Sequence, residues 1–200
     1  MSTWALVPVK ARQAGKLRLA GALPDALRAQ LVRRMLDDVL AAVNASGAID
    51  GTVVMSPERD LLPAVLRVLQ DPAAEMNAAL ELAREELERG GATCVAVVAA
   101  DLPLLEARDI GELIDAARTG GVALAPDAAG TGTNAVALTL PTAFRFQFGP
   151  GSYALHGAEA ARHGLTAATV TTSGLGFDVD AAADLERLRR NRLPRYAFLG

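Results

Sequence analysis

The most apolar stretch of the chain is Thr93-Cys-Val-Ala-Val-Val-Ala-Ala100, and Asp101-Leu-Pro103 follows it directly. Three valines in eight residues, with no polar position after the first threonine and cysteine, favour a β-strand that is covered on both faces. A strand of this kind belongs in the centre of a sheet. We therefore predict a central strand over residues 93–100, with the carboxylate of Asp101 at its carboxyl end.

The sequence on both sides of this stretch alternates between strand and helix patterns. Apolar residues at steps of three and four predict helices, and short apolar runs bounded by Gly, Pro or charged residues predict strands. This alternation favours an α/β fold of three layers, α/β/α, with a mainly parallel, Rossmann-like sheet. We predict one domain over residues 1–200, with strands at 5–9, 52–55, 93–100, 122–125, 135–140 and 167–171 and helices at 25–46, 60–69, 76–87, 106–118, 152–163 and 181–190.

The composition argues against several classes of function. Only 4% of the 200 residues are aromatic, so few rings are available to stack on nucleic-acid bases. The formal net charge of −3 gives no overall attraction to nucleic acid or to an anionic membrane. No run approaches the roughly 20 apolar residues of a membrane helix. We expect a cytoplasmic protein that holds anionic ligands with a local cluster of cations.

The residue types of many catalytic and metal sites are scarce in this chain. Cys94 is the only cysteine, so neither an intrachain disulfide nor a cysteine-based zinc site is expected. His156 and His163 have no carboxylate at metal-ligand spacing, and we interpret them as part of a solvated helix face. The chemistry is therefore expected to depend on carboxylates and cations.

Three carboxylates are candidates for a metal site. Asp101 follows the central strand, and ligands of open α/β sheets bind at the carboxyl ends of the strands. Asp178 and Asp180 are two residues apart, which in an extended segment points both to one side, with Val179 facing the core. Mg²⁺ is commonly held by one or two carboxylates together with phosphate oxygens and water. The alternative is that Asp101 and Asp180 cap the helices that follow them, and the spacing alone leaves both interpretations open.

Three further segments are candidates for binding an anion. Lys10, Lys16 and Arg18 place three cations within nine residues, after the first predicted strand. Gly130-Thr-Gly-Thr-Asn-Ala135 has the spacing of a dinucleotide fingerprint, but a strand pattern follows where that motif requires a helix. We interpret it as a loop that offers amides and hydroxyls to an anion. Phe148-Gly-Pro-Gly-Ser152 precedes a helix, and its serine is the expected N-cap. Surface charge and ordinary capped turns are the plainer alternatives.

Seven short segments, in order along the chain, carry a resemblance to a known family. They are Val7-Pro-Val-Lys10, Gly15-Lys-Leu-Arg-Leu19, Met76-Asn-Ala-Ala-Leu80, Ala99-Ala-Asp-Leu-Pro-Leu-Leu105, Gly130-Thr-Gly-Thr-Asn134, Phe148-Gly-Pro-Gly-Ser152 and Phe177-Asp-Val-Asp180. The ordered set covers nearly the whole chain. It resembles the phosphoenolpyruvate and 2-phospho-L-lactate guanylyltransferase family of coenzyme F-420 biosynthesis.

This resemblance implies a nucleotidyltransferase fold like that of the molybdenum-cofactor guanylyltransferases. It implies transfer of GMP from GTP to a three-carbon phosphorylated acid, above all phosphoenolpyruvate, with release of pyrophosphate and with Mg²⁺ as cofactor. The catalytic residues would be Asp101, Lys16 and Arg18. The wider set carried over by motif position is Asp101, Asp178 and Asp180 for the metal, Thr133, Gly149 and Ser152 for the acceptor, and Lys10, Lys16 and Arg18 for the GTP phosphates. Ser56 and Asn77, from their place at predicted strand ends, are candidates for contacting the base.

Other acceptors and other functions stay open at this point. Members of the resembling family also use 2-phospho-L-lactate or 3-phospho-D-glycerate. Another nucleotidyltransferase would share the fold and the carboxylates, and a non-catalytic module would bind GTP without releasing pyrophosphate. The expected partners are GTP and a small phosphorylated acid, with no nucleic acid and no membrane. The oligomeric state is open, and a homodimer is one option.

Overall fold

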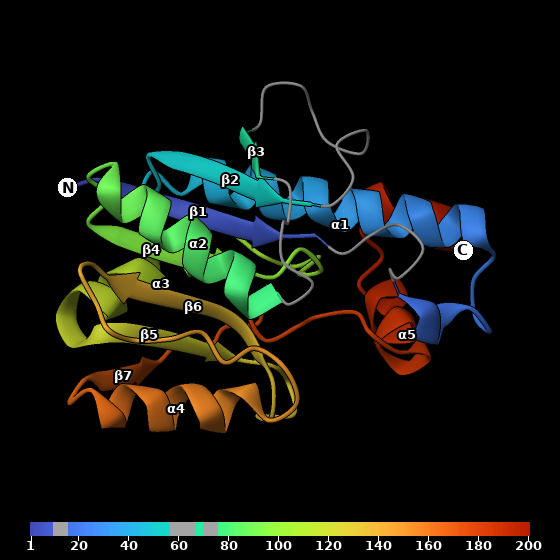
Figure 1. Cartoon of the computed structure of the whole chain (residues 1–200). Coiled ribbons are helices and arrows are strands. Elements are labelled where there is room, and N and C mark those ends of the chain that lie inside the picture. The colour runs from blue at the N-terminus through green and yellow to red at the C-terminus, as the bar shows by residue number, and fades with distance from the viewer. Residues whose placement is uncertain (10–15, 57–66, 70–75) are drawn as a thin grey trace.

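The computed structural model describes residues 1–9, 16–56, 67–69 and 76–200. In these ranges, strands form a seven-stranded sheet in the order β3-β2-β1-β4-β6-β5-β7 (Figure 1). The strands are β1 (Thr3–Pro8), β2 (Gly51–Met55), β3 (Arg67–Leu69), β4 (Cys94–Val98), β5 (Gly121–Pro126), β6 (Thr133–Thr139) and β7 (Thr166–Thr169). The predicted central strand is confirmed, because β4 lies in the middle of the sheet and all five of its residues are buried.

The direction of one strand decides which residues meet at the edge of the sheet. β1 is parallel to β2 and β4, β2 is parallel to β3, and β5 is parallel to β7. β6 is antiparallel to both of its neighbours, β4 and β5. The prediction of a mainly parallel sheet is therefore confirmed. Because β6 runs the other way, its first residues, Thr133 and Asn134, lie at the edge where β1, β2 and β4 end.

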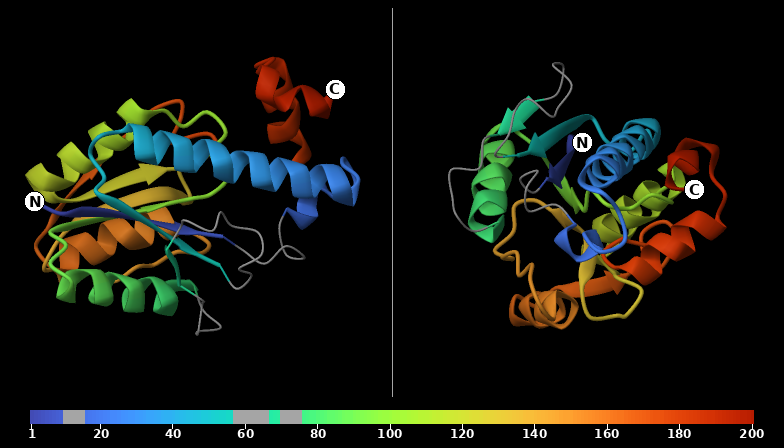
Figure 2. Two further views of the ribbon diagram at one scale, coloured as in Figure 1. Left: turned by 90° about the horizontal axis from the view of Figure 1, so that it is seen from above. Right: turned by 90° about the vertical axis from the view of Figure 1, so that its right-hand side faces the viewer.

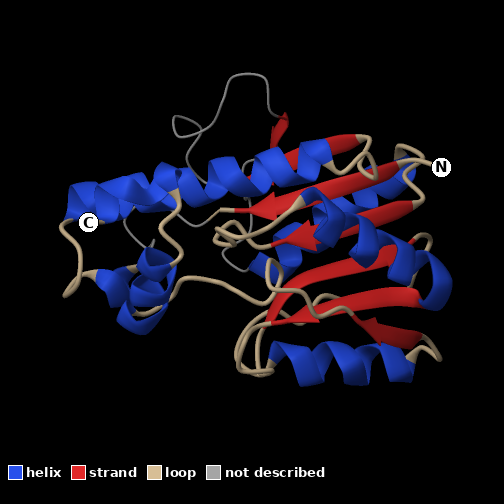
Figure 3. Cartoon of the chain, turned by 180° about the vertical axis from the view of Figure 1, so that it is seen from behind, coloured by secondary structure: helices blue, strands red, loops and turns tan. Residues whose placement is uncertain are grey.

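Helices cover both faces of this sheet, so the predicted three-layer architecture is also confirmed. They are α1 (Asp25–Ala45), α2 (Met76–Arg89), α3 (Ala107–Gly120), α4 (Ser152–Arg162) and α5 (Ala182–Arg190), with short 3-10 segments η2 (Leu17–Leu19) and η4 (Pro194–Leu199). α1 and α3 pack on one face (Figure 3), and α2 and α4 pack on the other (Figure 2). No helix in the described ranges is both long and apolar enough to cross a membrane.

The helix predicted over residues 60–69 is wrong at its end. Residues 67–69 form β3, whose backbone pairs in parallel with residues 53–55 of β2. Residues 60–66 lie outside the described part of the chain. A parallel neighbour satisfies the N–H and C=O groups on the outer edge of β2, and this long-range pairing overrides a local helical pattern.

A third apolar cluster lies beyond the carboxyl edge of the sheet, where α5 and η4 pack on the amino-terminal half of α1 (Figure 1). The buried carboxylate of Asp38 in α1 accepts hydrogen bonds from Arg195 Nε and from the Tyr196 hydroxyl, both at 2.7 Å. Burial and this carboxylate raise the pKa of Tyr196. The cluster also includes Phe177 and Val179, so it draws the segment before α5 across the end of the sheet.

Gly174 lies where the segment before α5 passes the start of α3, and this position requires a glycine. A Cβ atom on Gly174 would overlap the Asp109 carboxylate and would lie 2.8 Å from the Leu104 carbonyl oxygen. The Asp109 carboxylate cannot easily move aside, because Asp109 is buried and accepts the Glu106 N–H at 2.8 Å. Only a residue without a side chain fits at this crossing.

We expect Gly174→Ala to lower the free energy of unfolding by about 1–3 kcal/mol through overpacking. Urea unfolding followed by circular dichroism measures this change. Gly111→Ala in α3 is the matched control, because its Cβ would meet nothing within 4 Å. The control should raise stability by about 0.5–1 kcal/mol, since Ala is the better helix former. Equal stability of the two variants would show that the crossing tolerates a methyl group.

Candidate active site at the carboxyl edge of the sheet

Lys16 joins two of the three predicted metal-site carboxylates. Asp101 follows β4 in a turn, and its side chain is 26% exposed. The Lys16 ammonium forms an ion pair with Asp101 and lies 2.5 Å from Oδ1 of Asp180. Burial alone would lower the pKa of Lys16, but the charges and hydrogen bonds of Asp101 and Asp180 raise it. The ammonium therefore stays charged and brings together two carboxylates that are distant in sequence.

The segment before α5 has the predicted arrangement. Val179 is fully buried in the third apolar cluster, while Asp178 is half-buried and Asp180 is exposed. The alternative that Asp180 caps the last helix is wrong, because α5 begins at Ala182 and Asp184 accepts the N–H groups of residues 180 and 181 at 3.1 and 2.8 Å. Asp101 is not a cap either, since the N-cap residue of α3 is Glu106.

Asn134 is a site residue that the sequence reasoning missed. Its amide Nδ2 donates to the Leu175 carbonyl oxygen at 2.8 Å and to Oδ1 of Asp178 at 3.3 Å. Burial raises the pKa of Asp178, the negative charge of Asp101 raises it further, and the hydrogen bond from Asn134 opposes this shift. The signal in the sequence was a polar residue in second place of an otherwise apolar strand. Asn134 thus ties β6 to the carboxylate segment.

The donor chemistry of this cluster suits a hard cation. Asp101, Asp178 and Asp180 carry three negative charges, and Lys16 supplies one positive charge against them. Carboxylate oxygens are the ligands that Mg²⁺ prefers. Within the described ranges, no group of three His, Cys, Asp or Glu side chains is arranged to hold a metal ion as it stands. Here the ammonium of Lys16 bridges Asp101 and Asp180, so a cation would have to displace it.

The predicted phosphate-binding cations are only partly placed. Lys10 lies outside the described residues, and Arg18 is exposed. Lys16 has a φ of 56°, in the left-handed region that few residues other than glycine adopt. Its carbonyl oxygen accepts the Leu19 N–H at 2.9 Å, which closes the turn of η2. The ion pairs with Asp101 and Asp180 hold the Lys16 side chain in place.

The three predicted acceptor residues come from two loops that touch. Thr133 begins β6, and Gly149 precedes α4; the Tyr153 N–H donates to the Thr131 carbonyl oxygen at 3.2 Å. Ser152 is not the N-cap, as the sequence had suggested, but the first residue of α4. The N-cap is Gly151, whose φ of 72° suits glycine and moves the serine one residue into the helix.

Two backbone amides of these loops already have partners within the protein. The Thr131 N–H donates to Oδ1 of Asp127 at 2.9 Å, so this amide of the loop over residues 130–134 already has a partner within the protein. The Ser152 N–H likewise donates to the Gly149 carbonyl oxygen at 3.1 Å. By contrast, the Ser152 hydroxyl makes no hydrogen bond to a described residue, although Ser152 as a whole is only 2% exposed.

The two candidates for contacting the base come from different elements. Ser56 directly follows β2 and is fully buried. Asn77, in the first turn of α2, donates to the Phe148 carbonyl oxygen and accepts the Phe148 N–H, both at 2.9 Å. Asn77 therefore fixes the backbone next to Gly149, and base recognition by either residue stays a prediction.

The interpretation of both histidines as part of a solvated helix face is wrong for His156. This residue is fully buried, with Nδ1 3.0 Å from the Thr133 hydroxyl and Nε2 2.9 Å from the Gln147 N–H. His163 is partly exposed and lies 3.1 Å from Glu159. A histidine satisfied on both ring nitrogens can occupy an apolar interior.

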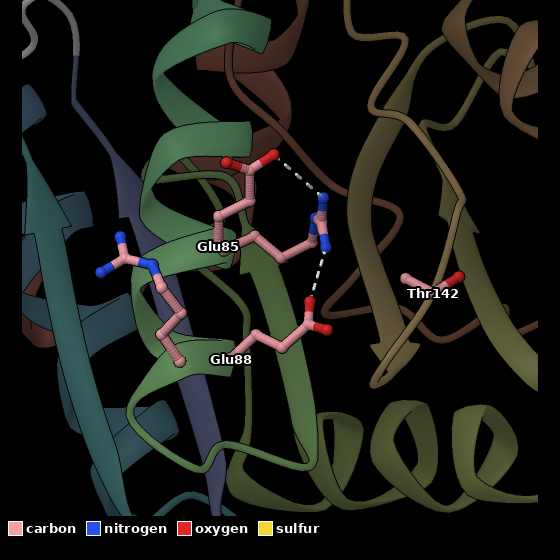
Figure 4. Close-up of a pocket in the computed structure, with 5 residues that line it drawn as sticks. Glu85, Glu88 and Thr142 are labelled. Carbon is pink, nitrogen blue, oxygen red and sulfur yellow. Dashed lines mark hydrogen bonds and ion pairs between the residues drawn. The ribbon is translucent and has the colours of Figure 1, made fainter.

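A depression of about 540 Å³ on the outer side of α2 is separate from this site. It is lined by Arg84, Glu85, Glu88, Arg89 and Thr142 (Figure 4). The buried Arg84 guanidinium lies 2.9 Å from Glu88 and 3.7 Å from Glu85, and the two arginines of the lining balance its two glutamates in charge. Such a surface leaves little net charge for a phosphate or a cation.

Solved structures share this fold. The chain matches a structure described as a putative nucleotide-diphospho-sugar transferase from Desulfovibrio desulfuricans G20, with a TM-score of 0.81, 18% identity and coverage of 100% of this chain and 94% of that one. At this identity the likeness shows the fold alone.

Sequence comparison identifies the family. Residues 3–189 match the family model described as "Guanylyl transferase CofC like". The chain is 41% identical over 192 residues to a phosphoenolpyruvate guanylyltransferase of Sphaerobacter thermophilus, covering 94% of this chain and 93% of that protein. It is 40% identical over 196 residues to the enzyme of the same name from Chloroflexus aggregans, covering 92% and 94%. The chain belongs to the CofC-like guanylyl transferase family and is an enzyme, as the seven motifs predicted.

The burial of His156 has a consequence for stability at acid pH. Burial lowers the pKa of His156 from 6.5 to about 4, although the charge of Glu159 opposes the shift. Below pH 6.5 the unfolded chain therefore binds a proton that the folded protein takes up only near pH 4. Stability is full above pH 6.5 and falls as the pH decreases, by about 2 kcal/mol between pH 7 and pH 4.5.

Urea unfolding of the protein and of His156→Gln at both pH values isolates this effect from that of the carboxylates. The difference in free energy of unfolding between the protein and His156→Gln should be about 2 kcal/mol smaller at pH 4.5 than at pH 7. His163→Gln is the matched control, and it should leave the pH dependence close to that of the unmodified protein. A constant difference between the protein and His156→Gln would mean that His156 titrates normally.

Proposed function

We propose that this enzyme transfers GMP from GTP to phosphoenolpyruvate and releases pyrophosphate, as a step of coenzyme F-420 biosynthesis. The curated relatives named above support the acceptor. The observation that carries the proposal is the meeting, at one edge of the sheet, of the acidic cluster around Lys16 with the hydroxyl-bearing loops of Thr133 and Ser152. The first part suits a nucleotide with its cation, and the second suits a small anion.

The reaction needs no side-chain base. An oxygen of the acceptor phosphate attacks the α-phosphorus of GTP, a new P–O bond forms, and the bond from the α-phosphorus to the bridging oxygen breaks. Pyrophosphate leaves with the electron pair of that bond. The nucleophile is already an anion at neutral pH, so catalysis consists of alignment and of neutralising charge. His156 fits this scheme, because both of its ring nitrogens are already hydrogen-bonded.

The carboxylate cluster is the part of the site that suits Mg²⁺. Asp101, Asp178 and Asp180 would hold the ion, which when bound would neutralise charge on the triphosphate. Lys16, released from Asp101 and Asp180, would turn to the departing pyrophosphate. Arg18, exposed two residues further on, would add positive charge, and the role of Lys10 stays a prediction of the sequence.

The acceptor would lie across the cluster from the nucleotide. The hydroxyls of Thr133 and Ser152 would donate to its carboxylate or phosphate oxygens. Gly149, with a φ of 141°, leaves the backbone open to close approach, and a Cβ at this position would be strained. A homodimer and a cytoplasmic location stay predictions of the sequence.

The acceptor is tested by pyrophosphate release with GTP, ATP or CTP against phosphoenolpyruvate, 2-phospho-L-lactate and 3-phospho-D-glycerate. We expect GTP with phosphoenolpyruvate to give the highest kcat/KM, because the relatives carry that activity in their names. Turnover with another of the three acids would correct the acceptor. GTP binding without release of pyrophosphate in any mixture would point to a binding module, and release with no phospho-acid of this set would point to another nucleotidyltransferase.

We expect Asp101→Asn to lower kcat by about 100-fold or more, because an amide cannot supply the charge that holds a cation against the triphosphate. The variant should still bind GTP, which calorimetric titration measures. Asp115→Asn is the matched control, since that carboxylate is exposed on α3 and pairs only with Arg118 in the described structure. A near-normal rate for Asp101→Asn would remove Asp101 from the metal site.

A further inference from the structure

The segment over residues 145–148 is held between α2 and α4 by four side chains. The N–H groups of residues 145 and 147 donate to Glu159 Oε1 and His156 Nε2 of α4, at 3.0 and 2.9 Å. Those of residues 146 and 148 donate to Glu81 Oε1 and Asn77 Oδ1 of α2, at 2.7 and 2.9 Å. Successive amides thus turn to opposite sides, as in an extended chain. This 145–148 segment delivers Gly149 to the edge of the sheet.

His156 differs from the other three side chains, because its second polar atom reaches the acceptor side. The Gln147 N–H can only donate, so Nε2 of His156 must accept with its lone pair. A neutral imidazole with an unprotonated Nε2 carries its hydrogen on Nδ1. Nδ1 therefore donates to the Thr133 hydroxyl oxygen, 3.0 Å away.

This assignment restricts the direction of the Thr133 hydroxyl. With one lone pair of Oγ1 taken by the hydrogen on Nδ1, the hydrogen of Thr133 itself must point elsewhere. Thr133 is 9% exposed at the edge of the sheet, so that hydrogen is available to an oxygen of an anion that binds there. A donor fixed in advance costs less entropy on binding than a hydroxyl that rotates freely.

We propose that His156 is a positioning residue of the acceptor site, whose Nδ1–H orients the Thr133 hydroxyl toward the acceptor anion while its Nε2 fixes the segment that carries Gly149. This inference rests on the proposed function for the identity of the anion. The histidine contacts no substrate, and it acts through Thr133 and the 145–148 segment.

The surroundings of His156 keep the ring in this state. It stacks on Phe144 at a centroid distance of 5.8 Å and meets Phe148 edge-on at 4.8 Å. The lowered pKa leaves the imidazole neutral above about pH 5, so that Nε2 remains an acceptor. The facing charged group, Glu159, is itself bound to Arg162, His163 and the Arg145 N–H.

The tautomer is tested directly by ¹⁵N NMR of the ring nitrogens. The chain has two histidines, and His163→Gln assigns the remaining signals to His156. We expect a protonated Nδ1 and an unprotonated Nε2, unchanged between pH 8 and pH 6. A protonated Nε2 would overturn the inference, whatever the enzyme's acceptor.

Steady-state kinetics test the action through Thr133. His156→Gln keeps an acceptor near the Nε2 position and loses the donor to Thr133, and we expect it to raise the KM for phosphoenolpyruvate about tenfold or more, as a lost hydrogen bond to a charged group does. His156→Asn keeps a donor near the Nδ1 position but loses the acceptor of the Gln147 N–H, so it should raise this KM less than His156→Gln does. The KM for GTP should change little in both.

A double-mutant cycle with Thr133→Val separates positioning from a merely structural role. If His156 acts through the hydroxyl, His156→Gln should change the acceptor KM by less than about twofold once the hydroxyl is absent. A full effect in that background, or equal losses in the Gln and Asn variants, would overturn the inference. The kinetic tests require that the unmodified enzyme turns over one of the three acids. If it turns over none of them, that result counts against the proposed function. The NMR measurement then still decides the tautomer of His156.

Discussion

The antiparallel pairing of β6 with β4 is the constraint on which the site depends. In a wholly parallel sheet the first residues of each strand lie at the amino edge, far from the ligand. The reversed β6 brings Thr133 and Asn134 to the carboxyl edge, beside the turn of Asp101, and the Ala99 N–H donates to the Asn134 carbonyl oxygen at 2.8 Å. One strand therefore links the carboxylate half of the site, through Asn134, to the acceptor half, through Thr133.

The second constraint is charge. Three carboxylates near one another are stable only with cations among them, and Lys16 takes this place in the described structure. Its left-handed φ is a local cost that the ion pairs with Asp101 and Asp180 offset. A divalent cation arriving with a nucleotide triphosphate would carry more positive charge to the same carboxylates and would free the ammonium for the phosphates. Lys16 would then neutralise the carboxylates in the absence of nucleotide and the phosphates in its presence.

The sequence could predict those features that are local. The valine-rich run of residues 93–100 encodes a buried strand, and the spacing of Asp178 and Asp180 around Val179 encodes a surface with two carboxylates. Strand direction is not local: the reversal of β6 depends on a hairpin that the apolar pattern does not distinguish from a crossover. The three-residue strand β3 likewise exists because β2 offers it an edge.

His156 was misplaced for a related reason. Alanines dominate α4, so its apolar stripe is too weak to show which face is buried, and a polar residue in such a helix is assigned to solvent by default. Its burial depends on Gln147 and Thr133, which lie outside the helix and satisfy both ring nitrogens. The ordered motifs found Thr133 and Ser152, but not the side chains that hold them.

The two halves of the site are built in different ways, and this difference has a consequence for the order of events. The acceptor half is buried, with Thr133, Ser152 and His156 all less than 10% exposed, and both ring nitrogens of His156 are hydrogen-bonded. The nucleotide half is more open: the side chain of Asp180 is 51% exposed, and Arg18 is at the surface. A rigid, prepared pocket binds its ligand at low entropic cost, whereas an open, charge-rich surface must rearrange when its ligand neutralises it. The nucleotide half is therefore the part expected to move during turnover, and the acceptor half is the fixed reference against which the α-phosphorus is aligned.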